Sequence, residues 1–256
     1  MLNFSANSVA EIYNCLGRVF KDGYHVEKSS PRGKQTLELI APSITLEYPR
    51  NRIAYHKDRR FSSKYALIES LMLFDNSNML RYFSYENANM AKFSDDGLTL
   101  YGSYGRRMAD LIKPAIDKLK SDKDTRQAVL PILCVEDPYT KTKDVPCTIS
   151  LQLLIRNNKL NMICNMRSND IYLGMPYDIF MFTMMQEVIA NELEIDIGWY
   201  VHRPASLHLY EENFGMFFDL YNNFGNIKIT NNCVYSGWLK IKDSYKEIIT
   251  LKKIQK

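Results

Sequence analysis

Apolar residues recur every three or four positions along several segments of the chain, and this spacing predicts helices with one buried face. Amphipathic helices are expected at residues 8–21, 108–120 and 211–221. Two further segments, 64–74 and 176–193, are apolar on almost every side, which is typical of helices buried in a core. We therefore expect these two helices to lie inside the molecule.

Short runs of aliphatic and β-branched residues between the helices predict strands. Residues 37–48 fit two short strands or one strand broken at Pro42, and Pro131 favours an edge position for a strand at 128–135. Residues 75–105 are rich in Asn, Ser, Tyr and Gly, and we expect a loop with short helical pieces that lines a ligand site. The remaining strand predictions are a hairpin of 148–156 and 159–166, one strand at 198–209, and a pair around 227–230 and 238–241.

No internal repeat and no linker-like change in composition interrupts the 256 residues, so we expect a single domain over 1–256. The order of the elements favours an α+β fold, with a large mixed β-sheet covered by helices. Hydrophobic residues make up 46% of the chain, enough for a sizeable core. The net charge of +4 is too small to indicate nucleic-acid binding, although it suits a small anionic ligand.

The five cysteines argue against both a disulfide framework and a structural metal site. Their number is odd and none belongs to a C-x-x-C pair, which favours a reducing compartment. The first residues lack the basic and apolar regions of a signal peptide, and no apolar run approaches the length of a membrane span. We therefore expect a cytoplasmic protein that binds neither a membrane nor a metal ion.

Cys147 is the first candidate for chemistry. A lone cysteine beside a strand is more often a small core residue, and that alternative stays open. Pro146 makes the approach to this strand rigid, while Asp144 and Asn165 indicate polar surroundings at the same end. Arg167, one strand further on, supplies a positive charge of the kind that lowers the pKa of a thiol.

Other side chains offer contacts to an anion, a sugar and a base. Arg167 and Ser168 combine a guanidinium fork with a hydroxyl, which suits a phosphate monoester, and Arg126 is a second candidate for that anion. His208 and Tyr210 alternate along a strand, so both point to one face. For each Arg a surface ion pair is the alternative, and for the His–Tyr pair it is a satisfied core contact.

Together these motifs resemble the thymidylate synthase superfamily, over about residues 66–210. The resemblance rests on P-C at Cys147, R-S-N-D at Arg167, L-G-M-P-Y-D at Leu173 and H-L-Y at His208, in that order. It implies an α+β fold and a homodimer packed sheet to sheet. It also implies a pyrimidine nucleoside monophosphate as substrate and 5,10-methylenetetrahydrofolate as the carbon donor.

The resemblance assigns roles to individual residues. It implies that Cys147 adds to C6 of the nucleotide, that Glu69 manages protons and water at the base, and that Tyr104 forms a cavity wall. It implies that the 5′-phosphate is bound by Arg167, Ser168, Arg32 and, across the dimer interface, Arg126. The base would be contacted by Asn169 and Asp170, and the sugar 3′-hydroxyl by His208 and Tyr210. The folate would be contacted by Phe93 and Gly174.

The chain departs from the family's thymidylate-forming members at several positions. Thr148 follows the nucleophile where those members have His, and Met166 and Asn169 flank the phosphate motif in place of Gln and Cys. Gln127 replaces the second of two partner-donated arginines, and the apolar C-terminal lid is replaced by L-K-K-I-Q-K at 251–256.

Asp178 is the departure with the clearest chemical meaning, because thymidylate synthases have Asn there. An amide complements the N3–H and O4 of uracil, whereas a carboxyl accepts a hydrogen bond from the N4 amino group of cytosine. The chain is therefore most similar to the deoxycytidylate hydroxymethylase branch. The alternative for Asp178 is simple N-capping of the helix that follows.

Three functions stay open at this stage. The first is a cytidylate hydroxymethylase, in which water adds to the transferred carbon. The second is a methylase, either a thymidylate synthase or a deoxycytidylate methylase, which releases dihydrofolate. The third is an inactive relative that only binds nucleotide. No residue of the sequence separates ribose from deoxyribose or identifies the pathway.

Overall fold

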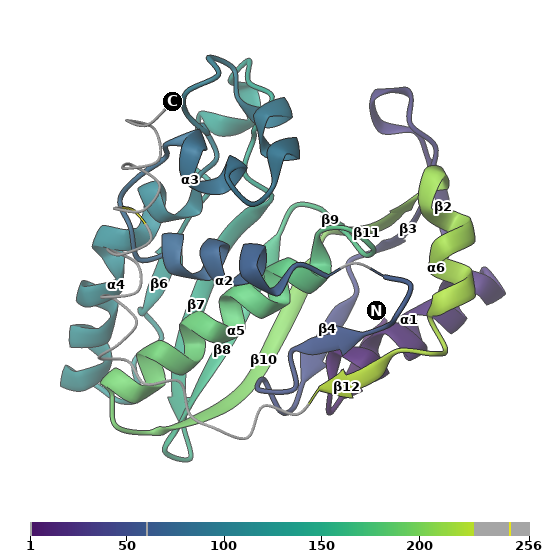
Figure 1. The fold of residues 1–256 in the computed structure, drawn as a ribbon. Coiled ribbons are helices and arrows are strands. Elements are labelled where there is room, and N and C mark those ends of the chain that lie inside the picture. Colours follow the sequence, from purple (N-terminus) through teal and green to yellow (C-terminus); the bar gives the residue numbers. More distant parts are fainter. Residues whose placement is uncertain (1, 60, 228–245, 247–256) are drawn as a thin grey trace.

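A six-stranded mixed sheet forms the centre of the computed structural model, which describes residues 2–59, 61–227 and 246 (Figure 1). The two central pairs are β10 with β8, which run parallel, and β8 with β7, which run antiparallel. In spatial order the strands are β1 (Asn3–Ala6), β4 (Ser43–Leu46), β10 (Asp196–Pro204), β8 (Lys159–Met166), β7 (Thr148–Arg156) and β6 (Val129–Pro131).

Two smaller sheets complete the strands. One has the order β2 (Glu27–Ser29), β3 (Thr36–Ile40), β11 (Ser206–Tyr210) and β9 (Asn169–Asp170). The other pairs β12 (Gly225–Ile227) with β5 (Ile53–Tyr55).

Helices cover one face of the central sheet (Figure 1). Helix α5 (Met175–Glu192) packs on β8 and β10, and α2 (Ser63–Met72) packs on α5. Gln186 of α5 is fully buried and donates hydrogen bonds to the carbonyls of Leu160 and Trp199, which fixes the helix on these two strands. The other helices are α1 (Val9–Asp22), α3 (Leu80–Ser84), α4 (Tyr104–Ser121) and α6 (Phe214–Leu220), with 3₁₀ turns η1 (Pro31–Gly33), η2 (Ala88–Phe93), η3 (Asp137–Tyr139) and η4 (Glu211–Asn213).

Local chemistry explains why several predicted elements are confirmed. The Ser8 hydroxyl accepts a hydrogen bond from the backbone N–H of Glu11 at the start of α1, and Gly23 ends the helix with φ of 72°. Asn157 and Asn158 both have positive φ in the β7–β8 hairpin, which matches the turn that such a two-residue loop requires. Pro131 lies in β6, at the edge of the sheet as expected.

Other predictions need correction. The single strand predicted at 198–209 is wrong, because β10 ends at Pro204, which has no N–H for a ladder, and β11 continues in the second sheet. The first turn of the helix predicted at 211–221 is the 3₁₀ turn η4. The strands predicted at 227–230 and 238–241 lie outside the described residues, apart from Ile227 in β12.

Candidate active site

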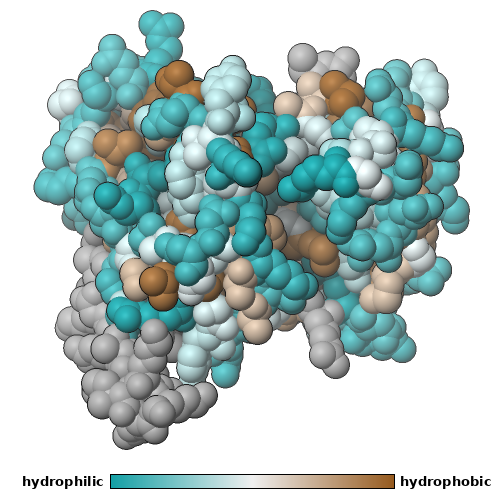
Figure 2. All heavy atoms as spheres, turned by 90° about the horizontal axis from the view of Figure 1, so that it is seen from above, coloured by the Kyte–Doolittle hydropathy of each residue, from teal (hydrophilic) through white to brown (hydrophobic). Residues whose placement is uncertain are grey.

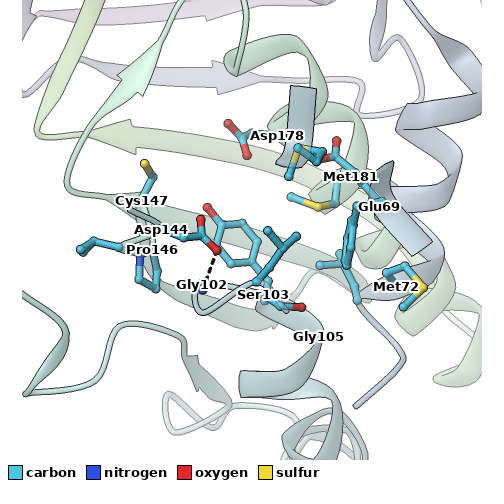
Figure 3. A pocket seen from close by; sticks show the side chains of 16 residues that line it. Glu69, Met72, Gly102, Ser103, Gly105, Asp144, Pro146, Cys147, Asp178 and Met181 are labelled. Carbon is cyan, nitrogen blue, oxygen red and sulfur yellow. Dashed lines mark hydrogen bonds between the residues drawn. The ribbon is translucent and has the colours of Figure 1, made fainter. Parts of the chain in front are cut away.

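Two adjoining hollows lie at the end of β7 and β8 where Cys147 and Arg167 stand, and they contain most of the predicted site residues. The first is a cavity lined by Cys147, Glu69, Asp178 and Tyr104, which reach it from different elements (Figure 3). The second is wider and holds the predicted phosphate and sugar contacts. Figure 2 looks down on this end of the molecule, which is hollowed between largely hydrophilic lobes. Asp144, Val145 and Cys147 line both hollows, so the two form one continuous site.

Cys147 stands immediately before β7 with its sulfur half-buried between the two hollows. Its Sγ lies 3.6 Å from Nη2 of Arg167 and 3.9 Å from Oγ of Ser168. Burial raises the pKa of the Cys147 thiol, and the nearby Arg167 charge opposes that rise without cancelling it. The expected positive charge is therefore present, but the predicted lowering of the pKa does not occur in the protein without substrate.

Backbone carbonyls of the segment that carries Cys147 hold Arg167 in place. Its Nε donates to the carbonyl of Pro146 at 2.8 Å, and Nη2 donates to that of Val145 at 2.9 Å. The side chain is nevertheless exposed, and Nη1 lies 3.4 Å from the Ser168 hydroxyl. Because its orientation is fixed and its outer edge is open, Arg167 can bind an anion with little further ordering.

Glu69 extends from α2 into the cavity, and its atom Oε2 is buried without a hydrogen-bond partner in the described structure. Burial raises the pKa of Glu69 to about 8, the contact with the Tyr65 hydroxyl lowers it in part, and the Asp178 charge raises it further. The carboxyl is therefore largely protonated at neutral pH in the free protein. An unpaired oxygen of this kind is positioned to bind water or substrate.

Asp178 lies in the first turn of α5, where its atom Oδ2 accepts a hydrogen bond of 2.7 Å from Nδ2 of Asn169. The helix begins at Met175, and Asp178 makes no capping hydrogen bond, so the interpretation of Asp178 as a simple N-cap is wrong. Burial raises its pKa to about 7, while the hydrogen bond from Asn169 acts in the opposite direction. Both protonation states of this carboxyl are thus accessible near neutral pH.

Tyr104 forms the floor of the cavity. Its ring stacks on Phe182 of α5 with centroids 5.9 Å apart, and its hydroxyl accepts a hydrogen bond of 3.3 Å from the backbone N–H of Thr148. Burial raises the pKa of Tyr104 well above its ordinary value, so the phenol stays neutral. Tyr104 therefore links α4 to the first residue of β7, directly after Cys147.

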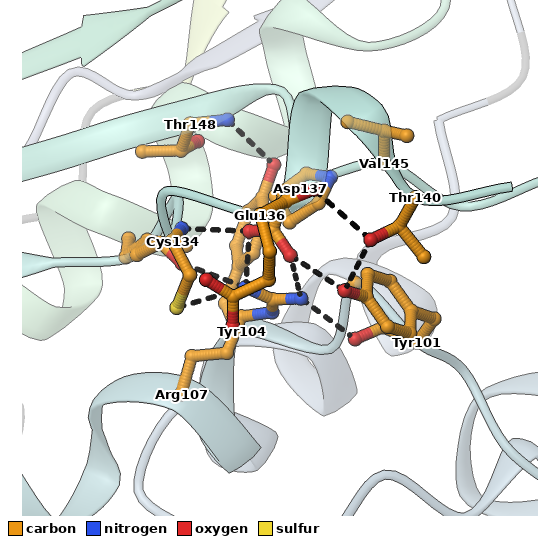
Figure 4. A network of polar contacts seen from close by, with 12 residues as sticks. Tyr101, Tyr104, Arg107, Cys134, Glu136, Asp137, Thr140, Val145 and Thr148 are labelled. Carbon is orange, nitrogen blue, oxygen red and sulfur yellow. Dashed lines mark hydrogen bonds and ion pairs between the residues drawn. The ribbon is translucent and has the colours of Figure 1, made fainter. Parts of the chain in front are cut away.

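A polar network braces the wall of the site on the same side (Figure 4). Arg107 of α4 forms a two-pronged pair with the buried carboxylate of Asp137, at 2.6 and 3.0 Å. Asp137 also accepts hydrogen bonds from the Tyr101 hydroxyl and from the backbone N–H of Cys134. Bidentate pairs of this kind are geometrically rigid, so the loop before Cys147 is tied firmly to α4.

The second hollow brings together four of the remaining predicted contacts. His208 and Tyr210 of β11 lie edge to face with ring centroids 5.0 Å apart, and Arg32 approaches from the 3₁₀ turn η1 with φ of 55°. Burial lowers the pKa of His208, so it is a neutral donor and acceptor suited to a sugar hydroxyl. Phe93, predicted to contact folate, also lines this hollow and is 45% exposed.

Four predicted residues line neither hollow. Asn169 is buried behind Asp178, and Gly174 lies beside the same pair, where an added Cβ would come within 3.1 Å of the Asn169 amide. The Asp170 carboxylate accepts two backbone hydrogen bonds at the start of the loop to α5. Arg126 is exposed on the approach to β6, and its carbonyl accepts a hydrogen bond from the Gln152 side chain. Arg126 therefore lies apart from both hollows of its own subunit.

Asp144 is a site residue that the sequence indicated only as part of a polar neighbourhood. Its atom Oδ2 accepts a hydrogen bond of 2.7 Å from the N–H of Gly102, and burial raises its pKa to about 6. Asp144 lines both hollows, three residues before Cys147. The sequence signal that could have identified Asp144 is a carboxyl side chain three residues before the predicted nucleophile.

The arrangement supports nucleophilic addition to a planar, electron-poor ring. A thiol, a carboxyl with a free oxygen and a second carboxyl surround one cavity, and a fixed guanidinium beside the thiol marks the place of an anion. No described group of three or more His, Cys, Asp or Glu side chains could hold a metal ion. Among the described helices, none is both long and apolar enough to cross a membrane.

Comparison with known proteins gives the family. The family model of thymidylate synthase matches residues 11–222, which is most of the chain. A deoxyuridylate hydroxymethyltransferase of Bacillus phage SP01 is 30% identical over 234 residues, covering 84% of this chain and 60% of the relative. A second protein of that name, from Pseudomonas phage M6, is 30% identical over 172 residues, covering 64% of this chain and 49% of the relative.

A further relative comes from an archaeon. A putative thymidylate synthase of Methanocaldococcus jannaschii is 27% identical over 215 residues, covering 82% of this chain and 91% of the relative. The chain spans only about half to three-fifths of the length of the two phage relatives. The family match extends over both hollows and every catalytic candidate in them, and this chain therefore belongs to the thymidylate synthase family.

Proposed function

We propose that the chain transfers a one-carbon unit to C5 of a pyrimidine nucleoside monophosphate and releases a 5-hydroxymethyl product. The observation that carries this proposal is the grouping of Cys147, Glu69 and Asp178 around one cavity, which opens onto the hollow of Arg167 and Ser168. A nucleotide fits such a site with its base in the cavity and its phosphate at the guanidinium.

The cavity also suits a flat folate ring beside the base. Part of its lining is apolar and consists of Met72, Phe83, Met90 and Leu100. Bound 5,10-methylenetetrahydrofolate would supply the one-carbon unit at the oxidation level of formaldehyde. Phe93 and Gly174 are proposed as further contacts to this co-substrate.

The residues of the chain perform the steps at the base. The Cys147 thiolate forms a bond to C6, and the electron pair of the C5–C6 double bond makes C5 the nucleophile. The carbon is transferred to C5, the C5 proton is lost and tetrahydrofolate leaves with the electron pair of its C–N bond, so the base then carries an exocyclic methylene group. Glu69, once ionised, takes a proton from a water molecule whose oxygen bonds to that carbon, and the sulfur leaves C6 with its electron pair.

Two observations support the hydroxymethyl product over the methyl product. The phage relatives are named for hydroxymethyl transfer, and the free Oε2 of Glu69 faces the cavity, where it could hold the attacking water. The methyl product, formed by hydride transfer with release of dihydrofolate, is the second candidate, favoured by the name of the archaeal relative.

Cytosine is the base that we propose, on the chemistry of Asp178. As a carboxylate it accepts the N4 amino hydrogen of cytosine, and as an acid it also donates to N3. Uracil is complementary to the protonated form alone, because a carboxylate repels O4. The names of the phage relatives favour uracil, so deoxyuridylate is the alternative substrate.

We also propose a homodimer in which the uncovered face of the central sheet is the interface. That face carries partly exposed side chains on β7 and β8, namely Ser150, Gln152, Leu154, Ile163 and Asn165. Gln152 contacts the carbonyl of Arg126, so this arginine lies at the border of the same face. A two-fold axis through the face would bring Arg126 to the partner's phosphate site.

A covalent trap tests the proposed chemistry directly. A 5-fluoro nucleotide cannot lose its C5 substituent as a proton, so the folate cannot be eliminated. The enzyme should stop with Cys147 bonded to C6 and with the folate still joined to C5 through the one-carbon unit. Mass spectrometry of the intact protein should show this adduct with 5-fluoro-dCMP and methylenetetrahydrofolate. Cys147→Ala should abolish it and Cys15→Ala, at an exposed cysteine of α1, should not. An adduct that survives Cys147→Ala would refute the proposal.

A further inference from the structure

A chain of buried polar side chains stands behind Asp178, on the helix-covered side of the central strands. The Tyr200 hydroxyl lies 2.8 Å from Nδ1 of His202, whose Nε2 lies 2.8 Å from Oδ1 of Asn169. The Asn169 amide in turn donates to Oδ2 of Asp178 at 2.7 Å. Tyr200 and His202 are fully buried and Asn169 is 4% exposed, so solvent does not interrupt the chain.

The hydrogen bonds can all run in one direction, toward Asp178. Burial lowers the pKa of His202 to about 3, so the imidazole is neutral, with one donor and one acceptor nitrogen. Since Asn169 presents its oxygen to Nε2, that nitrogen carries the hydrogen and Nδ1 accepts from Tyr200. The Tyr200 hydroxyl also contacts the buried thiol of Cys164. We call Tyr200, His202 and Asn169 the polar relay.

The relay restricts what Asp178 can present to a ligand. Its atom Oδ2 is occupied as an acceptor, so a proton on this carboxyl resides on Oδ1. If the Asn169 amide were reversed, the imidazole tautomer would have to change, and Oδ2 would have to carry the proton. With the observed amide orientation, Oδ1 of the protonated Asp178 is a donor, whereas with the reversed orientation Oδ1 is an acceptor. The hydrogen-bond partners of Asn169 decide which orientation is present.

We propose that the polar relay fixes the orientation and the proton position of Asp178, and thereby determines which pyrimidine base the site accepts. This inference rests on the proposed nucleotide-binding function. Asn169 contacts Asp178, His202 and Tyr200 act through Asn169, and none of the three lines either hollow, so they are positioning residues. Their buried polar groups would be costly in a core of this kind without mutual hydrogen bonds, and Asp178 is the one cavity-lining member to which the chain leads.

Binding measurements without folate test the relay. Calorimetry gives the dissociation constants of dCMP and dUMP for the wild type and for His202→Leu, which removes both ring nitrogens. Selectivity for dCMP over dUMP should fall about tenfold or more, because the Asn169 amide loses its fixed orientation. His202→Gln, which can still accept from Tyr200 and donate to Asn169, should recover part of the selectivity. Loss of packing alone would affect both nucleotides equally.

Two further variants guard against misfolding as an explanation. Tyr200→Phe removes a single hydroxyl of the relay and should lower the selectivity severalfold. Tyr13→Phe removes a buried hydroxyl of equal size that donates to the Ile171 carbonyl, outside the relay, and should leave the selectivity unchanged. Unchanged selectivity in both His202→Leu and Tyr200→Phe would overturn the proposed role of the relay and leave the proposed function standing. A wild-type protein that binds neither nucleotide would overturn the proposed function and the relay with it.

Discussion

At the scale of single residues, the site concentrates three carboxyls whose pKa values burial raises. These are Glu69 at about 8, Asp178 at about 7 and Asp144 at about 6. Buried acids of this kind reduce stability when they ionise, and they are common where proton transfer is required. The Asp178 charge also raises the pKa of Glu69, so ionisation of Asp178 makes ionisation of Glu69 less favourable.

Substitution of Asp178 tests the base preference. In Asp178→Asn the amide offers one donor and one acceptor, which complements O4 and N3–H of uracil. The ratio of kcat/KM for dCMP to that for dUMP should fall by about tenfold or more, since a lost hydrogen bond to a charged group is worth about 1.5–3 kcal/mol. Steady-state kinetics with both nucleotides measure the ratio, and an unchanged ratio would exclude Asp178 from base recognition.

Substitution of Glu69 tests the cost of its burial. The pKa of Glu69 is about 8 in the folded protein against 4.5 ordinarily, so the unfolded chain releases this proton first as pH rises. Its contribution to stability is therefore present below pH 4.5 and lost as pH rises to about 8. Glu69→Gln should abolish turnover and, at pH 9, stabilise the protein by about 1–3 kcal/mol. Urea unfolding of the wild type and of Glu69→Gln at pH 5 and pH 9 measures the free energy of unfolding. The same change in this free energy between pH 5 and pH 9 in both proteins would contradict the predicted cost of burying Glu69.

At the scale of elements, the sequence predicted most helices and the β7–β8 hairpin because their periodicity and turn residues are local properties. It could not predict that the chain changes sheets at Pro204–Ser206, since the pairing of β11 with β3 is decided by distant partners. For the same reason it showed His208 and Tyr210 as a pair on one strand but gave no reason to single out His202. That residue gains its meaning from Asn169, 33 positions away.

Mixing two inactive variants tests the arrangement of the proposed sheet interface. In a dimer that shares Arg126, Cys147→Ala and Arg126→Ala subunits together form one site with both residues intact. A random equal mixture should recover about a quarter of wild-type activity, because half of the dimers are mixed and each has one complete site. Activity assays after subunit exchange would measure the recovery. No recovery, with mixed dimers shown by mass spectrometry, would refute the contribution of Arg126 across the interface.

At the scale of the whole molecule, a mixed sheet covered by helices on one face places the start of β7, the start of α5 and the middle of α2 around one cavity. The resemblance of the sequence motifs to the thymidylate synthase family predicted this grouping before the fold was known, and the family match confirms the membership. In the proposed function, the choice of base and of product depends on proton positions at Asp178 and Glu69, which a sequence does not encode locally.

The product of one reaction tests the central proposal most directly. The protein is incubated with methylenetetrahydrofolate and either dCMP, CMP or dUMP, the product is weighed by mass spectrometry, and dihydrofolate is measured alongside. We predict that dCMP gains a hydroxymethyl group and that no dihydrofolate forms. A methylated nucleotide with one dihydrofolate per turnover, or turnover of dUMP but not of dCMP, would contradict the account.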